Sequence, residues 1–252
     1  MATPPDACCG DSAKPLPPKT EGGGGTGEVI DVKGLPMYVV GSGDVSIIAV
    51  YDIFGFTENK RTREVCDEIA SKVGARVVLP DFYRGDDVIK KFGCFPPPGG
   101  IAAVVEWVNA CAPMDKVLEE IDSIVIPYLK EQGACKAIGG VGFCWGGNVC
   151  IQGARKLKDL KAIAALHSNI QTKEDVADLD VPIALFQSGD DPPAASHVET
   201  LKDKPFYAKC VARDYPDMFH GWSLRADMSD AKYSAQANDV IQRTCDFFKA
   251  AM

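Results

Sequence analysis

The decapeptide IGGVGFCWGG, residues 138–147, joins a short apolar run to a Gly-x-Cys-x-Gly-Gly pattern. The run Ile138–Phe143 has the length and composition of a buried strand, and the residues after Cys144 are compatible with a helix. Glycine at positions 142 and 146 permits a strained, tightly packed bend that side chains would block. This is the pattern of a nucleophile elbow with sulfur in place of oxygen. We therefore predict that Cys144 is a nucleophile rather than an ordinary buried cysteine, and that the positive end of the following helix favours its thiolate.

Apolar runs of strand length recur on both sides of this segment and alternate with helical stretches. The other runs are Ser46–Tyr51, Arg76–Leu79, Ala162–Leu166 and Ile183–Phe186. Apolar residues at the 3.6-residue spacing of a helix form three stripes: Val65, Ile69 and Val73; Val117, Ile121, Ile124 and Tyr128; and Ala237, Ile241, Thr244 and Phe248. Strands that alternate with helices predict an α/β fold, in which a mostly parallel central sheet has helices on both faces.

Two short runs precede the sheet, at Glu28–Val32 and Met37–Val40, and glycine between them predicts an N-terminal antiparallel hairpin. Residues 1–27 are rich in proline and glycine and lack the apolar side chains that would offset the entropy of ordering them. We expect a flexible N-terminal segment over residues 1–27 and a single domain over residues 28–252. The segment Asp86–Gly100, which contains the sequence FPPPGG, lacks a helix or strand pattern, and this predicts a loop over one end of the sheet.

The charge of the chain excludes two classes of partner. The formal net charge is −8, from 27 basic and 35 acidic residues, so nucleic acid and anionic membrane surfaces would be repelled. No apolar run reaches the roughly 18 residues of a membrane helix. The start of the chain lacks the basic and apolar regions of a secretory signal. We expect a soluble, cytoplasmic protein, and the sequence leaves open whether it is a monomer or a homodimer.

The ten cysteines are scattered along the chain, and most lie between apolar neighbours. This distribution is typical of reduced, buried thiols rather than of a disulfide framework. The chain has no Cys-x-x-Cys pair and only three histidines, so no spacing supports a zinc site. We predict no metal and no cofactor, and the adjacent Cys8 and Cys9 have no spacing that supports a redox role.

A cysteine nucleophile needs a base, and the base needs a group that orients it. Ligands of open α/β sheets bind at the carboxyl ends of the strands, so residues that follow the apolar runs are the candidates. Asp190 and Asp191 follow the run that ends at Phe186, and His220 follows later in the chain. The order is nucleophile, acid, histidine, with gaps of 191 − 144 = 47 and 220 − 191 = 29 residues, which is one of the known orders of a catalytic triad. We predict the triad Cys144, Asp191 and His220.

Alternatives to the acid and to the base remain. Asp190 is adjacent to Asp191, and either residue would ordinarily belong to a turn before Pro192. His167 follows another apolar run and could line the same pocket, whereas we expect His197 on a surface helix.

Several separated motifs resemble the dienelactone hydrolase family of α/β-hydrolases, from about residue 28 to the C-terminus. They are Asp52-Ile53-Phe54-Gly55, Pro80-Asp81-Phe82-Tyr83-Arg84, Gly142 to Gly147, Gly189-x-Asp191 and His220-Gly221-Trp222. The resemblance implies an α/β-hydrolase fold and the same Cys-Asp-His triad. It also implies that the backbone N–H groups of Ile53 and Trp145 form an oxyanion hole, and that Arg84 and Arg225 hold a substrate carboxylate.

The chain departs from this family at one position, because bacterial members have glutamate where it has Asp52. In the family, that glutamate is thought to keep the resting thiol neutral until substrate displaces it, and aspartate is one methylene shorter. Two interpretations stay open: Asp52 contacts the thiol and the substrate, or it caps nearby N–H groups at the end of a strand. Aromatic side chains at the motif positions predict an apolar substrate cleft; they are Phe54, Tyr83, Trp145 and Trp222.

The expected reaction is a two-step acyl transfer from a small ester or lactone through a thioester. Because a thiolate is itself a good leaving group, the substrate must carry a comparably stable one, which favours activated esters and enol lactones over amides. Two other classes stay open. One is a noncatalytic ligand-binding or interaction protein on a hydrolase scaffold, and the other is a glycoside hydrolase that pairs Asp52 with Asp191 in one cleft.

Overall fold

The computed structural model describes residues 24–56 and 60–252, and within them the chain forms one eight-stranded sheet. The strand order is β1-β2-β4-β3-β5-β6-β7-β8. The pairs β1–β2 and β2–β4 are antiparallel, and every later pair is parallel. The strands are β1 (Glu28–Val32), β2 (Leu35–Val40), β3 (Val45–Val50), β4 (Arg76–Pro80), β5 (Ala137–Phe143), β6 (Leu160–Leu166), β7 (Ile183–Ser188) and β8 (Val211–Tyr215).

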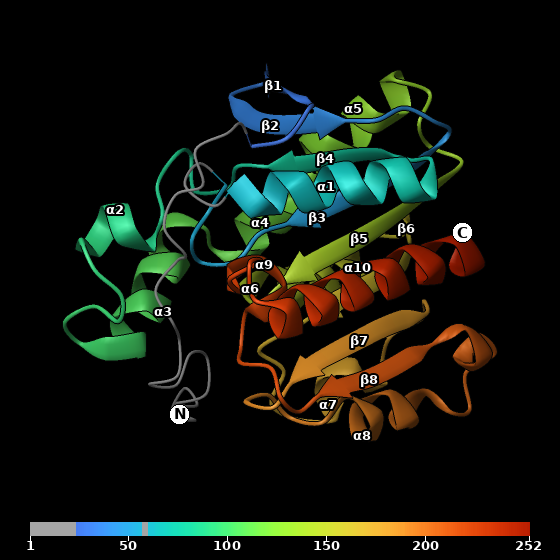
Figure 1. The fold of residues 1–252 in the computed structure, drawn as a ribbon. Coiled ribbons are helices and arrows are strands. Elements are labelled where there is room, and N and C mark those ends of the chain that lie inside the picture. Colours follow the sequence, from blue (N-terminus) through green and yellow to red (C-terminus); the bar gives the residue numbers. More distant parts are fainter. Residues whose placement is uncertain (1–23, 57–59) are drawn as a thin grey trace.

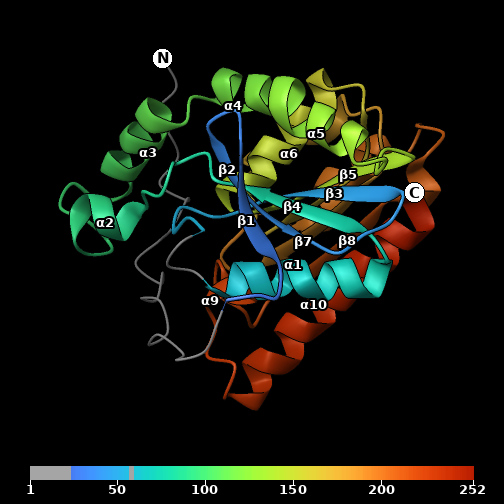
Figure 2. The same cartoon turned by 90° about the horizontal axis from the view of Figure 1, so that it is seen from above.

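Helices cover both faces of this sheet. Helices α1, α9 and α10 lie on one face, and α4, α5 and α6 lie on the other (Figure 2). The helices are α1 (Lys60–Val73), α2 (Val88–Phe92), α3 (Gly100–Cys111), α4 (Met114–Glu120), α5 (Ile126–Glu131), α6 (Trp145–Lys156), α7 (Glu174–Ala177), α8 (Ala194–Val198), α9 (Trp222–Arg225) and α10 (Ala231–Ala251). The predicted α/β fold with an N-terminal antiparallel hairpin is thereby confirmed.

Strand β5 lies inside the sheet and positions the elbow. All seven of its residues are buried, as expected of a parallel strand covered on both faces. Its glycines let helices from both sides approach closely: a Cβ at Gly139 would meet the Phe248 ring of α10, and one at Gly140 would meet Cys150 of α6. The close packing fixes the direction in which β5 delivers Cys144 at its end.

The segment predicted as a loop over residues 86–100 contains a helix, so that prediction was wrong for α2. Asp87 supplies the signal that the sequence analysis missed, because its side chain accepts the N–H groups of Ile89 and Lys90 and so caps the helix. Helices α2 and α3 lie beyond the carboxyl ends of the parallel strands (Figure 1). They therefore stand at the edge of the sheet where a ligand site is expected.

The apolar stripe Val117 to Tyr128 is not one regular helix. A π-helical turn over Ile121–Val125 separates α4 from α5. The N–H of Ile126 donates to the carbonyl of Ile121, five residues back, and Pro127 has no N–H with which to continue the ordinary ladder. The proline is the physical reason for the irregular turn.

Most of the predicted flexible segment, residues 1–23, lies outside the described residues. Its last part is anchored on α1 and β2: the Thr26 N–H donates to Asp67 Oδ2 at 2.6 Å, and the Gly27 N–H donates to the Tyr38 hydroxyl at 2.7 Å. Within ranges 24–56 and 60–252, none of the helices combines the length and apolarity needed to cross a membrane.

Candidate active site

The bend at Cys144 connects β5 to α6. Its φ of 53° and ψ of −114° form a conformation that L side chains rarely adopt and that costs free energy. Two hydrogen bonds hold the bend, from the Cys144 N–H to the Leu166 carbonyl (3.0 Å) and from the Gly147 N–H to the Cys144 carbonyl (3.1 Å). A Cβ at Gly142 would collide with the backbone of Gly146, and a Cβ at Gly146 would collide with the last carbonyl of β3. Glycine at these two positions permits the strained bend.

The elbow places Cys144 at the amino end of a 12-residue helix. The first N–H groups of a helix have no partner within the helix and carry partial positive charge, so this end favours an anion. Trp145 contributes the first of them, and Ile53 follows the neighbouring parallel strand β3. The two N–H groups predicted for the oxyanion hole therefore belong to the carboxyl ends of adjacent strands.

His220 and Asp191 form a buried pair in which Nδ1 and Oδ1 are 2.6 Å apart. The other oxygen, Oδ2, accepts the Ser188 N–H at 3.0 Å and the Ser188 hydroxyl at 2.6 Å. Burial pushes the pKa of Asp191 upward, but the hydrogen bonds from His220 and Ser188 outweigh it, so the pKa lies below its usual value. The ionised carboxylate therefore receives Nδ1–H and leaves Nε2 as the basic nitrogen of the ring. Nε2 is buried and has no hydrogen-bond partner within the described part of the chain.

The neighbouring carboxylate, Asp190, bonds to backbone rather than to the ring. Its Oδ2 accepts the His220 N–H at 2.9 Å. On the other side, Nη2 of Arg225 donates to the His220 carbonyl at 2.7 Å. Gly221, with φ of 90°, turns the chain directly into α9. The two adjacent aspartates thus hold different parts of His220, one its imidazole and the other its backbone.

A second buried pair joins Asp52 to Arg225, with Oδ2 and Nε 3.5 Å apart and each side chain 1% exposed. Oδ1 of Asp52 accepts the Phe54 N–H at 3.0 Å, which is the capping contact expected of a strand-end carboxylate. Burial raises the pKa of Asp52, although Arg225 and the Phe54 N–H act against that rise. The guanidinium also lies over the Phe54 ring, 4.7 Å from its centroid. Asp52 and Asp191 are therefore held in separate pairs.

Aromatic rings pack around the start of α6. The Tyr83 ring lies 5.0 Å from the Trp145 ring, 4.9 Å from the Tyr51 ring and 5.1 Å from the Trp107 ring of α3. Burial raises the pKa of Tyr83, and the charges of Cys144 and Asp52 are among the smaller causes. Its hydroxyl is buried with no hydrogen-bond partner among the described residues. The cluster is largely aromatic; the Tyr51 hydroxyl donates to Asp81 Oδ1 at 3.1 Å, whereas the Tyr83 hydroxyl has no such partner among the described residues.

Arg84 pairs with an acid that the sequence analysis did not consider. Its Nη2 and Nη1 donate to the Glu120 carboxylate at 2.7 and 3.3 Å, and Nη1 also donates to the Asp81 carbonyl at 2.9 Å. Glu120 is the last residue of α4 and precedes the π-helical turn. Both arginines assigned to a substrate carboxylate are therefore paired with carboxylates of the protein.

The remaining candidate residues lie deeper. Trp222 is fully buried and packs on Tyr215 and His167, at ring distances of 5.0 and 5.3 Å. The His167 ring lies 5.3 Å from the His220 ring. His197, expected on a surface helix, is in α8, but it is buried, and its Nδ1 bonds the Pro193 carbonyl at 2.8 Å.

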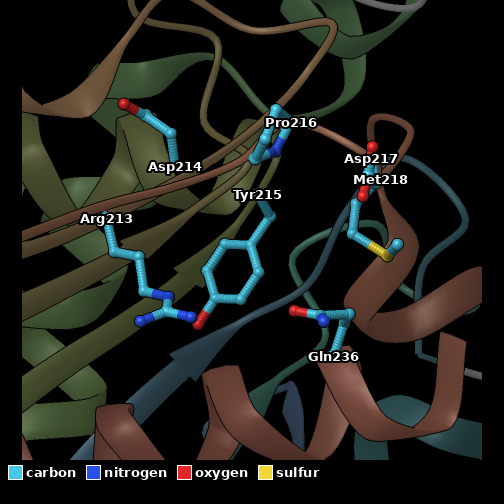
Figure 3. A pocket seen from close by; sticks show the side chains of 7 residues that line it. All are labelled: Arg213, Asp214, Tyr215, Pro216, Asp217, Met218 and Gln236. Atoms are coloured by element: carbon cyan, nitrogen blue, oxygen red, sulfur yellow. The ribbon is translucent and has the colours of Figure 1, made fainter. Parts of the chain in front are cut away.

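A pocket of about 180 Å³ lies beside the segment that leads to His220 (Figure 3). It contains none of the predicted site residues and is lined by Arg213, Asp214, Tyr215, Pro216, Asp217, Met218 and Gln236. Its lining is polar and belongs to β8, the following turn and α10, so it is distinct from the elbow. The described residues contain no group of three or more metal-ligating side chains, and none of the eight cysteines among them forms a disulfide.

Comparison with known proteins places the chain among hydrolases. The family model described as "Dienelactone hydrolase family" matches residues 35–252. A carboxymethylenebutenolidase homolog of Mus musculus is 32% identical over 185 residues, which cover 72% of this chain and 71% of that protein. An uncharacterized AIM2 family protein of Schizosaccharomyces pombe is 28% identical and covers 89% of this chain and 91% of its own.

The fold also matches solved structures. A crystal structure of a dienelactone hydrolase-like promiscuous phosphotriesterase from metagenomic libraries superposes with a TM-score of 0.60 at 16% identity. The match covers 90% of this chain and 98% of the other. At that identity the likeness shows the fold alone.

Proposed function

The chain belongs to the dienelactone hydrolase family and is an ester or lactone hydrolase; from this premise we propose that it cleaves a small activated ester or lactone with Cys144, His220 and Asp191. The observation that carries the proposal is the buried Asp191–His220 pair at 2.6 Å, which leaves Nε2 as a base at the same edge of the sheet as the strained elbow. A cysteine in that conformation, on that edge, is positioned for chemistry rather than for packing.

In the first step, Nε2 of His220 takes the thiol proton and the sulfur of Cys144 attacks the carbonyl carbon. The C–S bond forms while the carbonyl electron pair moves to oxygen, and the N–H groups of Ile53 and Trp145 stabilise that oxyanion. The intermediate then expels the alcohol or enolate, which takes the proton from His220 and so returns the imidazole to its neutral form. Asp191 stabilises the imidazolium throughout without receiving the proton.

In the second step, water restores the enzyme. His220 takes a proton from water as the oxygen attacks the thioester carbon. Collapse of the second intermediate breaks the C–S bond, and the sulfur takes the proton back from His220. The products are a carboxylic acid and the regenerated thiol. Because the sulfur is itself a good leaving group, acylation is favoured by a substrate leaving group of comparable stability. We therefore propose aryl esters and enol lactones, rather than amides, as the substrate class.

The surroundings of the elbow suit a flat, apolar acyl group with one hydrogen-bond acceptor. Tyr83 and Trp145 supply ring surface, and the Tyr83 hydroxyl supplies the donor. Phe54 and Trp222 are proposed as further walls of the cleft. A carboxylate on the substrate would meet Arg225 or Arg84 in competition with Asp52 or Glu120.

The test is a pair of cysteine variants assayed with an activated aryl ester. Cys144→Ala should lower kcat about 10³-fold or more, because it removes the group that forms the intermediate. Cys150→Ala is the matched control, since Cys150 is also a buried thiol of α6 and the proposal gives it no role. Turnover by a folded Cys144→Ala protein at the wild-type rate would refute the proposal.

A further inference from the structure

His167 follows β6 directly and lies against the base of the proposed triad. Its ring is fully buried and meets the His220 ring edge to face at 5.3 Å, and it meets the Trp222 ring in the same way at 5.3 Å. Its Nε2 forms a hydrogen bond of 2.7 Å with the hydroxyl of Ser223, which is also fully buried. The ring is therefore fixed on one side by α9 and presents another side to His220.

The backbone around His167 is strained and held in place. Its φ is 39°, in the left-handed region that a residue with a side chain rarely occupies. The His167 N–H donates to the Phe186 carbonyl at 2.7 Å. The next residue, Ser168, is clamped by the side chain of Gln187, which accepts its N–H at 2.9 Å and donates to its carbonyl at 3.1 Å. A strained conformation that its surroundings hold so firmly is typical of a functional position.

The same turn also supports the nucleophile. The carbonyl of Leu166, immediately before His167, accepts the Cys144 N–H at 3.0 Å. Two consecutive residues thus contact the two reacting groups of the site, Leu166 through the elbow backbone and His167 through the imidazole of His220. A displacement of this turn would change the geometry between sulfur and base.

His167 is suited to a packing role rather than to proton transfer. Burial lowers its pKa well below the usual value, and the nearby His220 and Arg225 lower it further, while Asp191 acts in the opposite direction. The ring therefore stays neutral next to His220. A neutral ring can hold the imidazole without repelling the imidazolium that forms during the reaction.

We propose that His167 is a positioning residue, whose ring fixes the orientation of the His220 imidazole toward Cys144. This inference rests on the proposed function. The Asp191–His220 hydrogen bond holds Nδ1 but leaves the ring free to tilt about that contact. The edge-to-face contact with His167 restricts that tilt, so that Nε2 keeps one direction.

The test separates the ring contact from the hydrogen bond with Ser223. In His167→Phe/Ser223→Ala, both polar partners are gone and the ring remains, so no buried donor or acceptor is left unpaired. In His167→Ala/Ser223→Ala the ring is gone as well. We expect the first double variant to keep kcat to within about fivefold of the wild-type value. The second should lose about 10- to 100-fold in kcat, because misplacing a reacting group lowers the rate by about this factor. KM should change less than about twofold in both. Melting temperatures identify any variant that fails to fold.

His197→Ala serves as the control for loss of a buried histidine. His197 is also buried and bonded to a backbone carbonyl, but it lies in α8 and contacts none of the proposed triad residues in the described structure. The His197→Ala variant should have a lower melting temperature and an unchanged kcat. Equal kcat values in the two double variants would overturn the proposal, whether both remain at the wild-type level or both fall. Because Cys144→Ala is assayed alongside, that outcome is distinguishable from failure of the cysteine mechanism.

Discussion

Two buried carboxylates at the carboxyl edge of the sheet each face a cationic or basic partner, but their hydrogen bonding differs. Asp191, on the β7 side, lies 2.6 Å from Nδ1 of His220 and accepts two further bonds from Ser188. Asp52, on the β3 side, accepts one backbone N–H and lies 3.5 Å from Nε of Arg225. The pKa of Asp191 is lowered and that of Asp52 is raised, although burial acts upward on both.

The comparison indicates that a nearby positive charge alone does not lower the pKa of a buried carboxylate here. Asp52 has a permanent cation beside it, yet burial prevails because few donors solvate its oxygens. Asp191 has a partner that is charged only when protonated, yet three donors hold its anion. The first arrangement tolerates a change of protonation state, and the second maintains the ionised acid that orients a base.

The largest effect is expected when the Asp191–His220 pair is broken. Asp191→Asn should lower kcat about 10³- to 10⁴-fold, because the amide no longer fixes the tautomer that leaves Nε2 basic. Asp190→Asn is the matched control one residue away. It weakens the bond to the His220 N–H and leaves the Asp191–imidazole bond in place, so we expect a loss of about fivefold or less. Steady-state kinetics with an aryl ester measures both, and a larger loss at Asp190 would reverse the assignment of the acid.

The sequence predicted Asp191 as the acid but left the adjacent Asp190 as an alternative. The elbow followed from the glycine spacing around Cys144, and the chain order of acid and histidine followed from residues after apolar runs. Asp190 and Asp191 are adjacent, however, and only the turn geometry directs one at the imidazole and the other at the backbone. Spacing along the chain carries no information about that choice.

Side-chain pairings between distant segments could not be predicted from the sequence either. Glu120 ends α4 beside an irregular turn caused by Pro127, and no local pattern connects it to Arg84. Ser223 and His167 are 56 residues apart and meet only in the packed fold. The fold class depended on periodicity, which is local, and was therefore predictable, whereas side-chain partners across the sheet edge depended on tertiary packing.

A smaller effect is expected from breaking the second pair. Asp52→Ala removes the carboxyl group that faces the buried guanidinium of Arg225 and that accepts the Phe54 N–H, so it should lower the free energy of unfolding by about 3 kcal/mol. Asp52→Ala/Arg225→Met also removes the buried guanidinium and should recover part of that loss. Urea unfolding measures the two variants, and a double variant no more stable than the single one would contradict the pairing.

The pH dependence of stability should have opposite signs for the two carboxylates. Asp191 has a lowered pKa in the folded state, so its contribution is complete above about pH 4 and is lost as the pH falls through the folded value. Asp52 has a raised pKa, so its contribution is complete below about pH 4 and is lost as the pH rises through the folded value. The stability of wild type relative to Asp191→Asn should increase with pH, and relative to Asp52→Asn it should decrease. Urea unfolding from pH 3 to 7 measures both stability differences. Slopes of the same sign for the two variants would contradict the prediction.

The smallest effect concerns a third pair, Arg84 with Glu120, whose side chains are 35% and 13% exposed. Water screens it, so Glu120→Gln should cost about 0.5 kcal/mol of stability. Releasing Arg84 should nevertheless raise kcat/KM for a carboxylate-bearing aryl ester relative to its neutral analogue. Asp115→Asn, which breaks a surface pair with Lys156, is the control. An unchanged ratio in Glu120→Gln would remove Arg84 from substrate binding.

The most direct test of the cysteine mechanism is alkylation by a low dose of iodoacetamide, with the modified residues identified by peptide mass spectrometry and activity followed in the same samples. Activity should fall in proportion to the fraction of Cys144 alkylated, whereas alkylation of the exposed Cys94 and Cys135 should leave activity unchanged. Full activity in protein whose Cys144 is completely alkylated would contradict the account.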